Sequence, residues 1–173
     1  MTEKALVRKC TSGEKRAQKE LYETYYMEMK RLVMRYLPNE NDAFDCLSQG
    51  FCKALTKIGQ FNYSGAGSLG AWIRKIMVNE SLQKLRESSR MAMVLNLEAT
   101  EPTDFFYEAS DASYIYECIQ ELPDGARTVF NLVAIEGYSH KEVAAQLHIS
   151  EGTSRSQLLY ARNKLKMLLE KME

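Results

Sequence analysis

The sequence has no apolar run of about 20 residues, the length needed to cross a bilayer. Residues 1–16 also lack the apolar stretch and the small-residue cleavage site of a secretion signal. Hydrophobic residues make up 45% and charged residues 27% of the 173-residue chain, which is typical of a folded globular protein. We therefore expect a cytoplasmic protein that does not insert into membranes.

Metal ligands and catalytic groups are scarce. The chain has two histidines and four cysteines, with no C-x-x-C pair among Cys10, Cys46, Cys52 and Cys118. His140 and His148 are distant in sequence from all four, so buried free thiols are favoured over a zinc site. The sequence has no nucleotide-binding loop and no paired nucleophile and base. We assign no catalytic residue, metal or cofactor, and an enzyme is the weakest interpretation.

Alternating strand patterns are also missing, whereas apolar residues recur every three or four positions. One helical segment follows Ser12 and ends at Pro38, the next is capped by Asn41, and a third by Ser68. Three long amphipathic helices can close one core, so residues 1–95 predict a helical domain. The apolar stripes are Ala17, Leu21, Tyr25, Met29, Leu32 and Tyr36, then Phe44, Leu47, Phe51, Leu55 and Ile58, then Leu69, Trp72, Ile73, Ile76 and Leu85.

Charge is unevenly distributed, although the net charge is zero. Residues 1–95 carry 16 basic and 10 acidic residues, whereas residues 96–121 carry seven acidic residues and no basic one. Residues 122–173 carry seven basic and six acidic residues. An uneven charge distribution of this kind gives information about binding partners rather than about the fold. Helical periodicity stops over residues 96–112, which we interpret as a flexible acidic linker between two small all-α domains.

The C-terminal domain, residues 113–173, is expected to hold most of four helical segments. They cover residues 111–122, which stop at Pro123, residues 124–136, which stop at Gly137, residues 140–147, and a longer stretch from Ser150 to about Lys171. Ser139 and Glu142 form a capping box that opens the third segment. The apolar positions of the first two are Tyr114, Ile115, Cys118 and Ile119, then Val129, Phe130, Leu132 and Val133.

The last two segments have the layout of a helix-turn-helix. A short helix with an apolar face is followed by a tight turn through His148 and Ile149. The second helix can then enter a major groove with its N-terminal residues at the base edges. The pattern favours DNA binding over an ordinary helical hairpin with a solvated basic face. The outward basic residues are Arg155, Arg162, Lys164 and Lys166, and the inward apolar ones are Leu158, Ala161, Leu165 and Leu168.

Two blocks of the chain resemble one family of transcription factors. Region 4 of the sigma-70 family resembles the block ELPDGARTVFNLVAIEGYSHKEVAAQLHISEGTSRSQLLYARNKL. Region 2 of that family resembles the stretch from LYETYY through ENDAFDCLSQGFCKAL to FNYSGAGSLGAWIRKIMVNESLQKLR. The two blocks have no further domain between them, and in this the chain resembles the extracytoplasmic-function (ECF) group of the family. The resemblance implies a sigma factor that binds core RNA polymerase and directs promoter recognition and transcription initiation.

The resemblance also implies how the chain meets core polymerase. Region 2 of the family grips the clamp helices of the largest subunit, and region 4 meets the flap. The matching polar positions are Asp45 and Gln49, which lie one helical turn apart and can contact a partner together. Phe51 belongs to the apolar stripe and is expected in the core. Gly50 replaces the usual Glu of the family, a departure that bears on the strength or geometry of the polymerase contact and not on the assignment.

Region 2 of the family reads the minus-ten element with a glycine-rich loop. Holding an unstacked base costs a few kcal/mol, which pocket contacts offset. In this chain the resemblance places Asn62, Tyr63 and Ser64 in that loop, with Arg74, Lys75 and Asn79 as further DNA candidates on the next helix. Trp72 is expected in the core rather than as a stacking platform.

Region 4 of the family reads the minus-35 element with the start of the second helix. The matching positions are Arg155, Ser156 and Leu159 toward bases, with Thr153, Gln157 and Arg162 near phosphates. Gln157 and Tyr160 stand where the family often has basic residues, so we expect a shallow salt dependence and reliance on tethering to polymerase.

Several alternatives stay open from the sequence. A plain helix-turn-helix regulator would leave residues 1–95 unexplained. A sigma mimic that sequesters an anti-sigma factor would be free to lose its DNA-facing side chains. The acidic linker is either a solvated spacer or, as the resemblance implies, a segment that threads the polymerase channels. We expect promoter DNA and an anti-sigma factor as partners, and a monomer when free.

The linker hypothesis predicts a salt-dependent phenotype. Surface substitutions change stability by no more than about 0.5 kcal/mol. Neutralising the acidic linker residues with Gln and Asn should therefore leave thermal melting almost unchanged but weaken initiation at low salt, and the loss should shrink as salt screens the charges. Run-off transcription at two salt concentrations measures this, and equal activity of variant and parent at low salt would make the linker a spacer. The four positions are Glu98, Glu101, Asp104 and Glu108.

Overall fold

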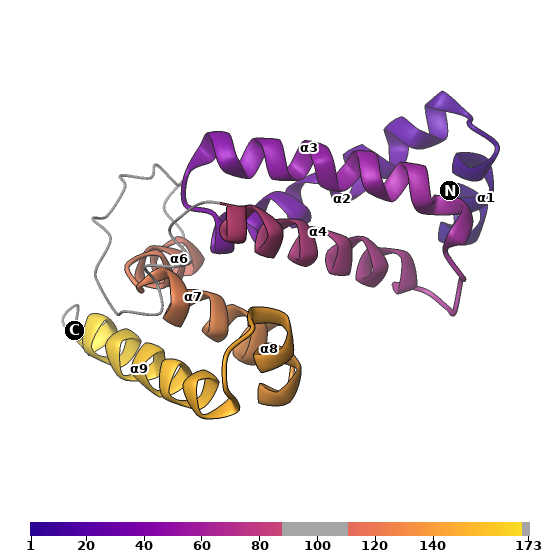
Figure 1. Cartoon of the computed structure of the whole chain (residues 1–173). Helices are drawn as coiled ribbons and strands as arrows, with labels where there is room; N and C mark the ends of the chain where they lie inside the picture. The colour runs from indigo at the N-terminus through magenta and orange to yellow at the C-terminus, as the bar shows by residue number, and fades with distance from the viewer. Residues whose placement is uncertain (88–110, 171–173) are drawn as a thin grey trace. The chain divides into compact units, whose positions relative to one another are not determined.

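The computed structural model describes residues 1–87 and 111–170, in which every regular element is a helix (Figure 1). The chain divides into two compact units, residues 1–84 and 85–173. The all-helical fold class is confirmed. The predicted linker, residues 96–112, lies outside the described residues except for its last two, which begin a helix, so the exact domain limits stay predictions. None of the helices described is long and apolar enough to cross a membrane.

The first unit begins with a short helix that the sequence did not predict. Its elements are α1 (Glu3–Thr11), α2 (Lys15–Tyr36), α3 (Glu40–Lys57), the 3-10 turn η1 (Ile58–Gln60) and α4 (Ser68–Glu87). The N–H of Ala5 donates to the Thr2 hydroxyl at 3.4 Å, which caps α1, and Leu6 and Cys10 are buried. With only two buried anchors, α1 leaves a weak periodic signal.

The predicted caps of α2 and α3 were wrong. The Asn39 side chain accepts from the N–H groups of Asn41 at 3.0 Å and Asp42 at 3.1 Å, so Asn39 caps α3 and Asn41 does not. The Ser12 hydroxyl donates back to the Lys9 carbonyl at 2.9 Å and does not cap α2. Both helices nevertheless start within three residues of the expected positions, because the apolar periodicity sets their extent.

The core of this unit is built by α2, α3 and α4. Residues such as Leu21, Met29 and Ile73 are fully buried, as their stripes predict. Phe44 was placed in the stripe but is 60% exposed, because the buried face of α3 runs one position ahead of it, through Ala43. Partly buried stripe positions are Tyr25, Leu55, Trp72 and Ile76.

Gly50 of α3 lies against Met77 of α4. A Cβ at this position would meet the Met77 Sδ at 2.3 Å, and both residues are buried. Position 50 therefore faces the interior of the first unit. A glycine in a helix costs about 1 kcal/mol relative to alanine, and here a methyl group at position 50 would force the Met77 side chain to shift.

The second unit consists of α6 (Asp111–Gln120), α7 (Asp124–Phe130), the π turn η2 (Asn131–Ile135), α8 (His140–Leu147) and α9 (Glu151–Glu170). Leu122, Ala126 and Ala161 form its central cluster, with Phe130 and Leu165 packed against them. Ile115 is 53% exposed, so its placement on the apolar face was wrong.

Arg127 joins α6 to α7 inside this unit. It is 2% exposed, and its Nη1 donates to the carbonyls of Gln120 at 3.1 Å and Leu122 at 2.9 Å. Its Nη2 forms an ion pair with the buried Asp124 carboxylate. The charge is thus paired, and it satisfies carbonyl groups that the end of α6 leaves open.

Three of the four cysteines are buried as expected, but Cys52 is exposed. Burial raises the pKa of the Cys46 thiol to about 11, and its sulfur lies 3.6 Å from the Ser81 Oγ. Among the residues described, no cluster of side chains has the composition of a metal site.

The Gly50 contact predicts a background-dependent effect of alanine. Gly50→Ala should destabilise the first unit by about 1–3 kcal/mol, because the added methyl overpacks the core. In a Met77→Ala background the same change should instead stabilise by up to about 1 kcal/mol, the helix-propensity gain. Urea unfolding followed by fluorescence of Trp72, the only tryptophan, reports on this unit. The same effect in both backgrounds would show that Met77 does not require the glycine.

Candidate nucleic-acid interface

The start of α8 is closed by the predicted capping box, which is confirmed. The Ser139 hydroxyl accepts from the N–H of Glu142 at 3.3 Å, and the Glu142 carboxylate accepts from the N–H of Ser139 at 2.8 Å. Two of the open N–H groups at the helix start are satisfied in this way. The first helix of the predicted helix-turn-helix therefore has a defined beginning.

The turn between α8 and α9 depends on a left-handed residue. His148 has φ 55°, a conformation that histidine tolerates better than most residues. The N–H groups of His148 and Ile149 both donate to the Ala144 carbonyl, the second at 3.1 Å. The turn takes three residues, and α9 starts at Glu151.

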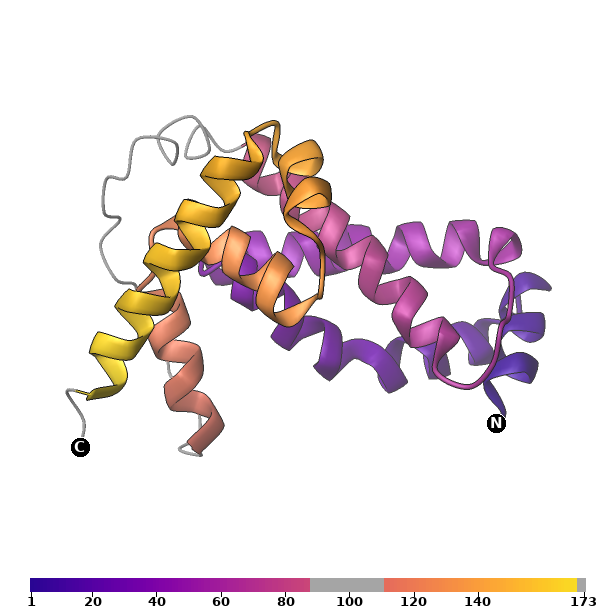
Figure 2. The ribbon, with the colours of Figure 1, turned by 90° about the horizontal axis from the view of Figure 1, so that it is seen from below.

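Two hydroxyl contacts fix the start of α9. The Ser150 hydroxyl accepts from the N–H of Thr153 at 2.9 Å and lies 2.9 Å from its hydroxyl. The fully buried Ser154 hydroxyl lies 2.8 Å from the Nδ1 of His140 at the start of α8. α9 also packs against α6 and α7, as Figure 2 shows from below. Helix α9 is therefore held on one side and exposed on the other.

The exposed side of α9 presents most of the predicted base-reading residues. Arg155, Ser156 and Arg162 are exposed, and Leu159 is 61% exposed. Positions 155, 159 and 162 follow helical spacing and share one face. The Arg155 guanidinium pairs with the Glu151 carboxylate at 2.8 Å. Exposed pairs contribute about 0–1 kcal/mol, so DNA can displace this contact.

The predicted phosphate contact of Gln157 is wrong. Its side chain is only 8% exposed and lies on the inward face with Ser154, Leu158 and Ala161. The spacing of these four positions is that of one helix face, and polar side chains at two of them masked it in the sequence. Thr153 is partly buried and engages Ser150.

The glycine-rich segment in the first unit joins η1 to α4. Asn62, Tyr63 and Ser64 are exposed, as expected of residues that meet a ligand. The N–H of Ser64 donates to the Ser68 Oγ at 3.4 Å, and that hydroxyl donates to the Gly65 carbonyl at 2.6 Å. Ser68 is thus the first residue of α4 and ties the loop to it, rather than standing before the helix as its cap.

The aromatic ring of Phe61 supports the beginning of the same loop. It packs against the half-buried Trp72, with ring centroids 5.3 Å apart. Trp72 is therefore a support of the loop from α4 and not a fully enclosed core residue. On the same helix Lys75 and Asn79 are exposed one turn apart, and Arg74 is partly buried and pairs with Glu28 at 3.2 Å.

Glu3 is a residue of this site that sequence reasoning missed. Its Oε2 accepts from the N–H of Gly67 at 3.0 Å, and its Oε1 accepts from the N–H of Leu69 at 3.0 Å. The Tyr25 hydroxyl donates to Oε1 at 3.1 Å. The pKa of Tyr25 is raised to about 12, mainly because the hydroxyl is buried and secondly because of its hydrogen bond to Glu3. No local pattern links Glu3 to positions more than 60 residues away.

Asp45 and Gln49 lie on the exposed face of α3, as expected. The Asp45 carboxylate is 3.7 Å from the Lys84 Nζ, which also lies 3.5 Å from Asp42. Phe51 is 3% exposed and packs against Tyr22 with ring centroids 4.7 Å apart, so its core placement is confirmed. The polar pair is thus available to a partner, whereas Phe51 is not.

Comparison with known proteins identifies both units. Residues 21–91 match the family model of sigma-70 region 2, and residues 112–165 match that of sigma-70 region 4. The chain is 25% identical over 182 residues to the RNA polymerase sigma-H factor of Pseudomonas aeruginosa, covering 95% of this chain and 92% of that protein. It is 26% identical over 190 residues to the ECF RNA polymerase sigma-E factor of Escherichia coli, covering 99% and 98%.

A solved structure has a similar fold. The sigma factor RpoE of Bartonella quintana, in complex with the anti-sigma factor NepR, matches with a TM-score of 0.54 and 22% identity. The match covers 88% of this chain and 96% of that one.

Proposed function

The chain belongs to the ECF group of the sigma-70 family, whose members are non-enzymatic factors that direct transcription initiation. We propose that this chain directs initiation through the exposed faces of α9, the loop 61–67 and α3. The supporting observation is that both regions occur in one chain and each leaves polar residues exposed at the matching positions. A plain helix-turn-helix regulator does not account for the match to region 2 over residues 21–91.

We assign minus-35 recognition to the exposed face of α9. Arg155 can make a bidentate contact with guanine, and the exposed Leu159 can meet a thymine methyl. Arg162, two turns further along the helix, suits a phosphate contact that positions the helix without reading sequence. Thr153 and Ser156 are assigned to the same interface, and the buried Gln157 is not.

We assign minus-ten recognition to the loop between η1 and α4. Asn62 and Ser64 can hydrogen-bond a base edge, and the exposed ring of Tyr63 offers stacking worth about 1–3 kcal/mol per base. Lys75 and Asn79 on α4 offer contacts to the adjacent backbone, together with Arg74 if it leaves Glu28.

We assign core polymerase binding to Asp45 and Gln49 on α3, opposite the clamp helices of the largest subunit, and to the second unit at the flap. The nearby Lys84 limits the net charge that Asp45 presents. The exposed face of α3 holds none of the residues assigned to DNA, so binding of polymerase there leaves those residues free.

We also propose that an anti-sigma factor regulates the chain, as NepR is seen bound to the structurally similar RpoE. The factor works in the cytoplasm, beside polymerase and chromosome, and is a monomer when free. The remaining rival, a sigma mimic, would bind the anti-sigma factor without supporting transcription.

The proposed function predicts that the protein has no promoter-specific activity alone but converts core polymerase into a promoter-selective holoenzyme. Run-off transcription with core polymerase from the source organism and its promoter fragments measures this. Identical transcripts with and without the protein would contradict the proposal and leave the mimic as the better account.

The two arginines of α9 should behave differently. Arg155→Ala should weaken transcription from promoters with the preferred minus-35 element by about 1–3 kcal/mol, as expected for a lost guanine contact. Arg162→Ala should weaken binding evenly across sequences and lower the salt dependence, because a phosphate contact carries no sequence information. Glu151→Gln, which frees Arg155, is the matched control and should not lose activity. Loss of activity by the two arginine variants in equal measure on every promoter would refute this assignment.

A further inference from the structure

The N-terminal helix α1 lies outside the residues that match region 2, which start at residue 21. It nevertheless contacts the end of the glycine-rich loop through one side chain. We propose that Glu3 is a positioning residue for minus-ten recognition: its carboxylate holds the backbone at Gly67 and Leu69 and so sets the shape of the loop. This inference rests on the proposed role of that loop in reading DNA.

The Glu3 carboxylate caps α4, although it belongs to a distant segment of the chain. The first N–H groups of α4 need acceptors, and the Ser68 hydroxyl is occupied by the Gly65 carbonyl. Glu3 supplies one oxygen to Gly67 and the other to Leu69, both at 3.0 Å. A negative charge at the start of a helix is also favoured by the helix dipole.

The loop needs such an external restraint because of its glycines. Gly65 has φ 132° and Gly67 has φ 84°, backbone conformations that glycine adopts freely but does not hold on its own. The contact at Gly67 is three residues from Ser64, so it limits how the exposed residues 62–64 can move. Ordering them before DNA binds lowers the entropy that binding must overcome.

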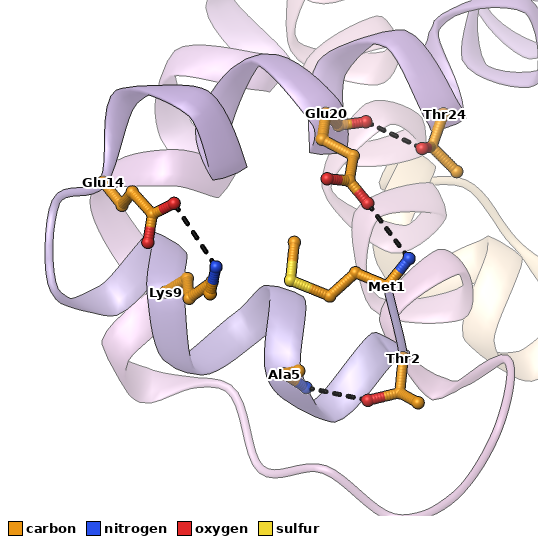
Figure 3. Close-up of polar contacts among 7 residues, drawn as sticks. All are labelled: Met1, Thr2, Ala5, Lys9, Glu14, Glu20 and Thr24. Atoms are coloured by element: carbon orange, nitrogen blue, oxygen red, sulfur yellow. Dashed lines mark hydrogen bonds and ion pairs between the residues drawn. The ribbon is translucent and has the colours of Figure 1, made fainter.

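The position of Glu3 is set independently of the loop. Contacts at both ends of α1 hold this helix in place. Thr2 caps its start, the Met1 amino group lies 3.4 Å from the Glu20 carboxylate of α2, and Lys9 pairs with Glu14 at 3.4 Å (Figure 3). From α2, the Tyr25 hydroxyl donates to the same carboxylate, and its ring packs where a Cβ on Gly70 would come within 3.1 Å. The hydrogen bonds of the Glu3 carboxylate therefore join α1, α2 and α4.

Glu3→Gln tests the carboxylate with little change of shape. The amide keeps one acceptor oxygen and places an N–H donor where the second oxygen was, so one backbone contact is lost. We expect the holoenzyme to bind a single-stranded oligonucleotide carrying its minus-ten element about three- to tenfold more weakly, the change that loss of one hydrogen bond produces. Affinity for core polymerase, measured by competition with the parent protein, should stay unchanged.

Three further variants make the test specific. Glu23→Gln removes an exposed carboxylate that pairs with Lys19 at 3.6 Å, and it should leave oligonucleotide binding unchanged. Tyr25→Phe removes the hydroxyl that orients Glu3 and should weaken oligonucleotide binding less than Glu3→Gln does. Tyr63→Ala removes the proposed stacking residue itself. Thermal unfolding followed by Trp72 fluorescence identifies the temperature range in which all variants are folded.

The outcomes separate the inference from the function on which it rests. If Tyr63→Ala and Glu3→Gln both weaken oligonucleotide binding while polymerase affinity is retained, Glu3 positions the loop. If Tyr63→Ala weakens it and Glu3→Gln does not, the loop reads DNA but Glu3 has no part in it. If neither variant matters, the loop does not read the minus-ten element, and both proposals fail. Equal losses of oligonucleotide and polymerase affinity in Glu3→Gln would show a general structural role and overturn the inference.

Discussion

The backbone N–H groups at a helix start need acceptors, and in this chain the side chains that provide them also hold the surfaces proposed to meet DNA. Glu3 meets this demand for α4 and restrains the glycine-rich loop. Ser139 and Glu142 meet it for α8, and Ser150 meets it for α9. Each small unit therefore uses a few hydroxyl and carboxylate groups to fix both its fold and its exposed face.

Local patterns in the sequence predicted the helices and the capping box well. Apolar periodicity located α2, α3, α4 and α9 to within a few residues, because burial of one face dominates helix stability in a folded unit. The Ser139–Glu142 box was also recognisable, because all its contacts lie within four residues. The exposure of Arg155 on α9 follows from the same periodicity.

Local sequence patterns could not predict contacts between segments that are distant in the chain. Nothing near Gly50 in the sequence reveals Met77, and nothing near Gly67 reveals Glu3. The error at Gln157 has a different cause: a polar residue on the inward face of α9 looks like a surface residue when only hydrophobicity is considered. Phe44 shows the converse, an apolar residue placed one position off the buried face of α3.

The central claim is that two separate preformed surfaces, one in each unit, read two parts of a promoter. Sequencing transcripts that the holoenzyme starts from a randomised promoter library tests it most directly. The account predicts two separate blocks of preferred sequence. A substitution on α9 should weaken the sequence preference of the upstream block only, and a substitution in the loop 61–67 should weaken that of the downstream block only. A single block, or two blocks that both changes alter equally, would contradict it.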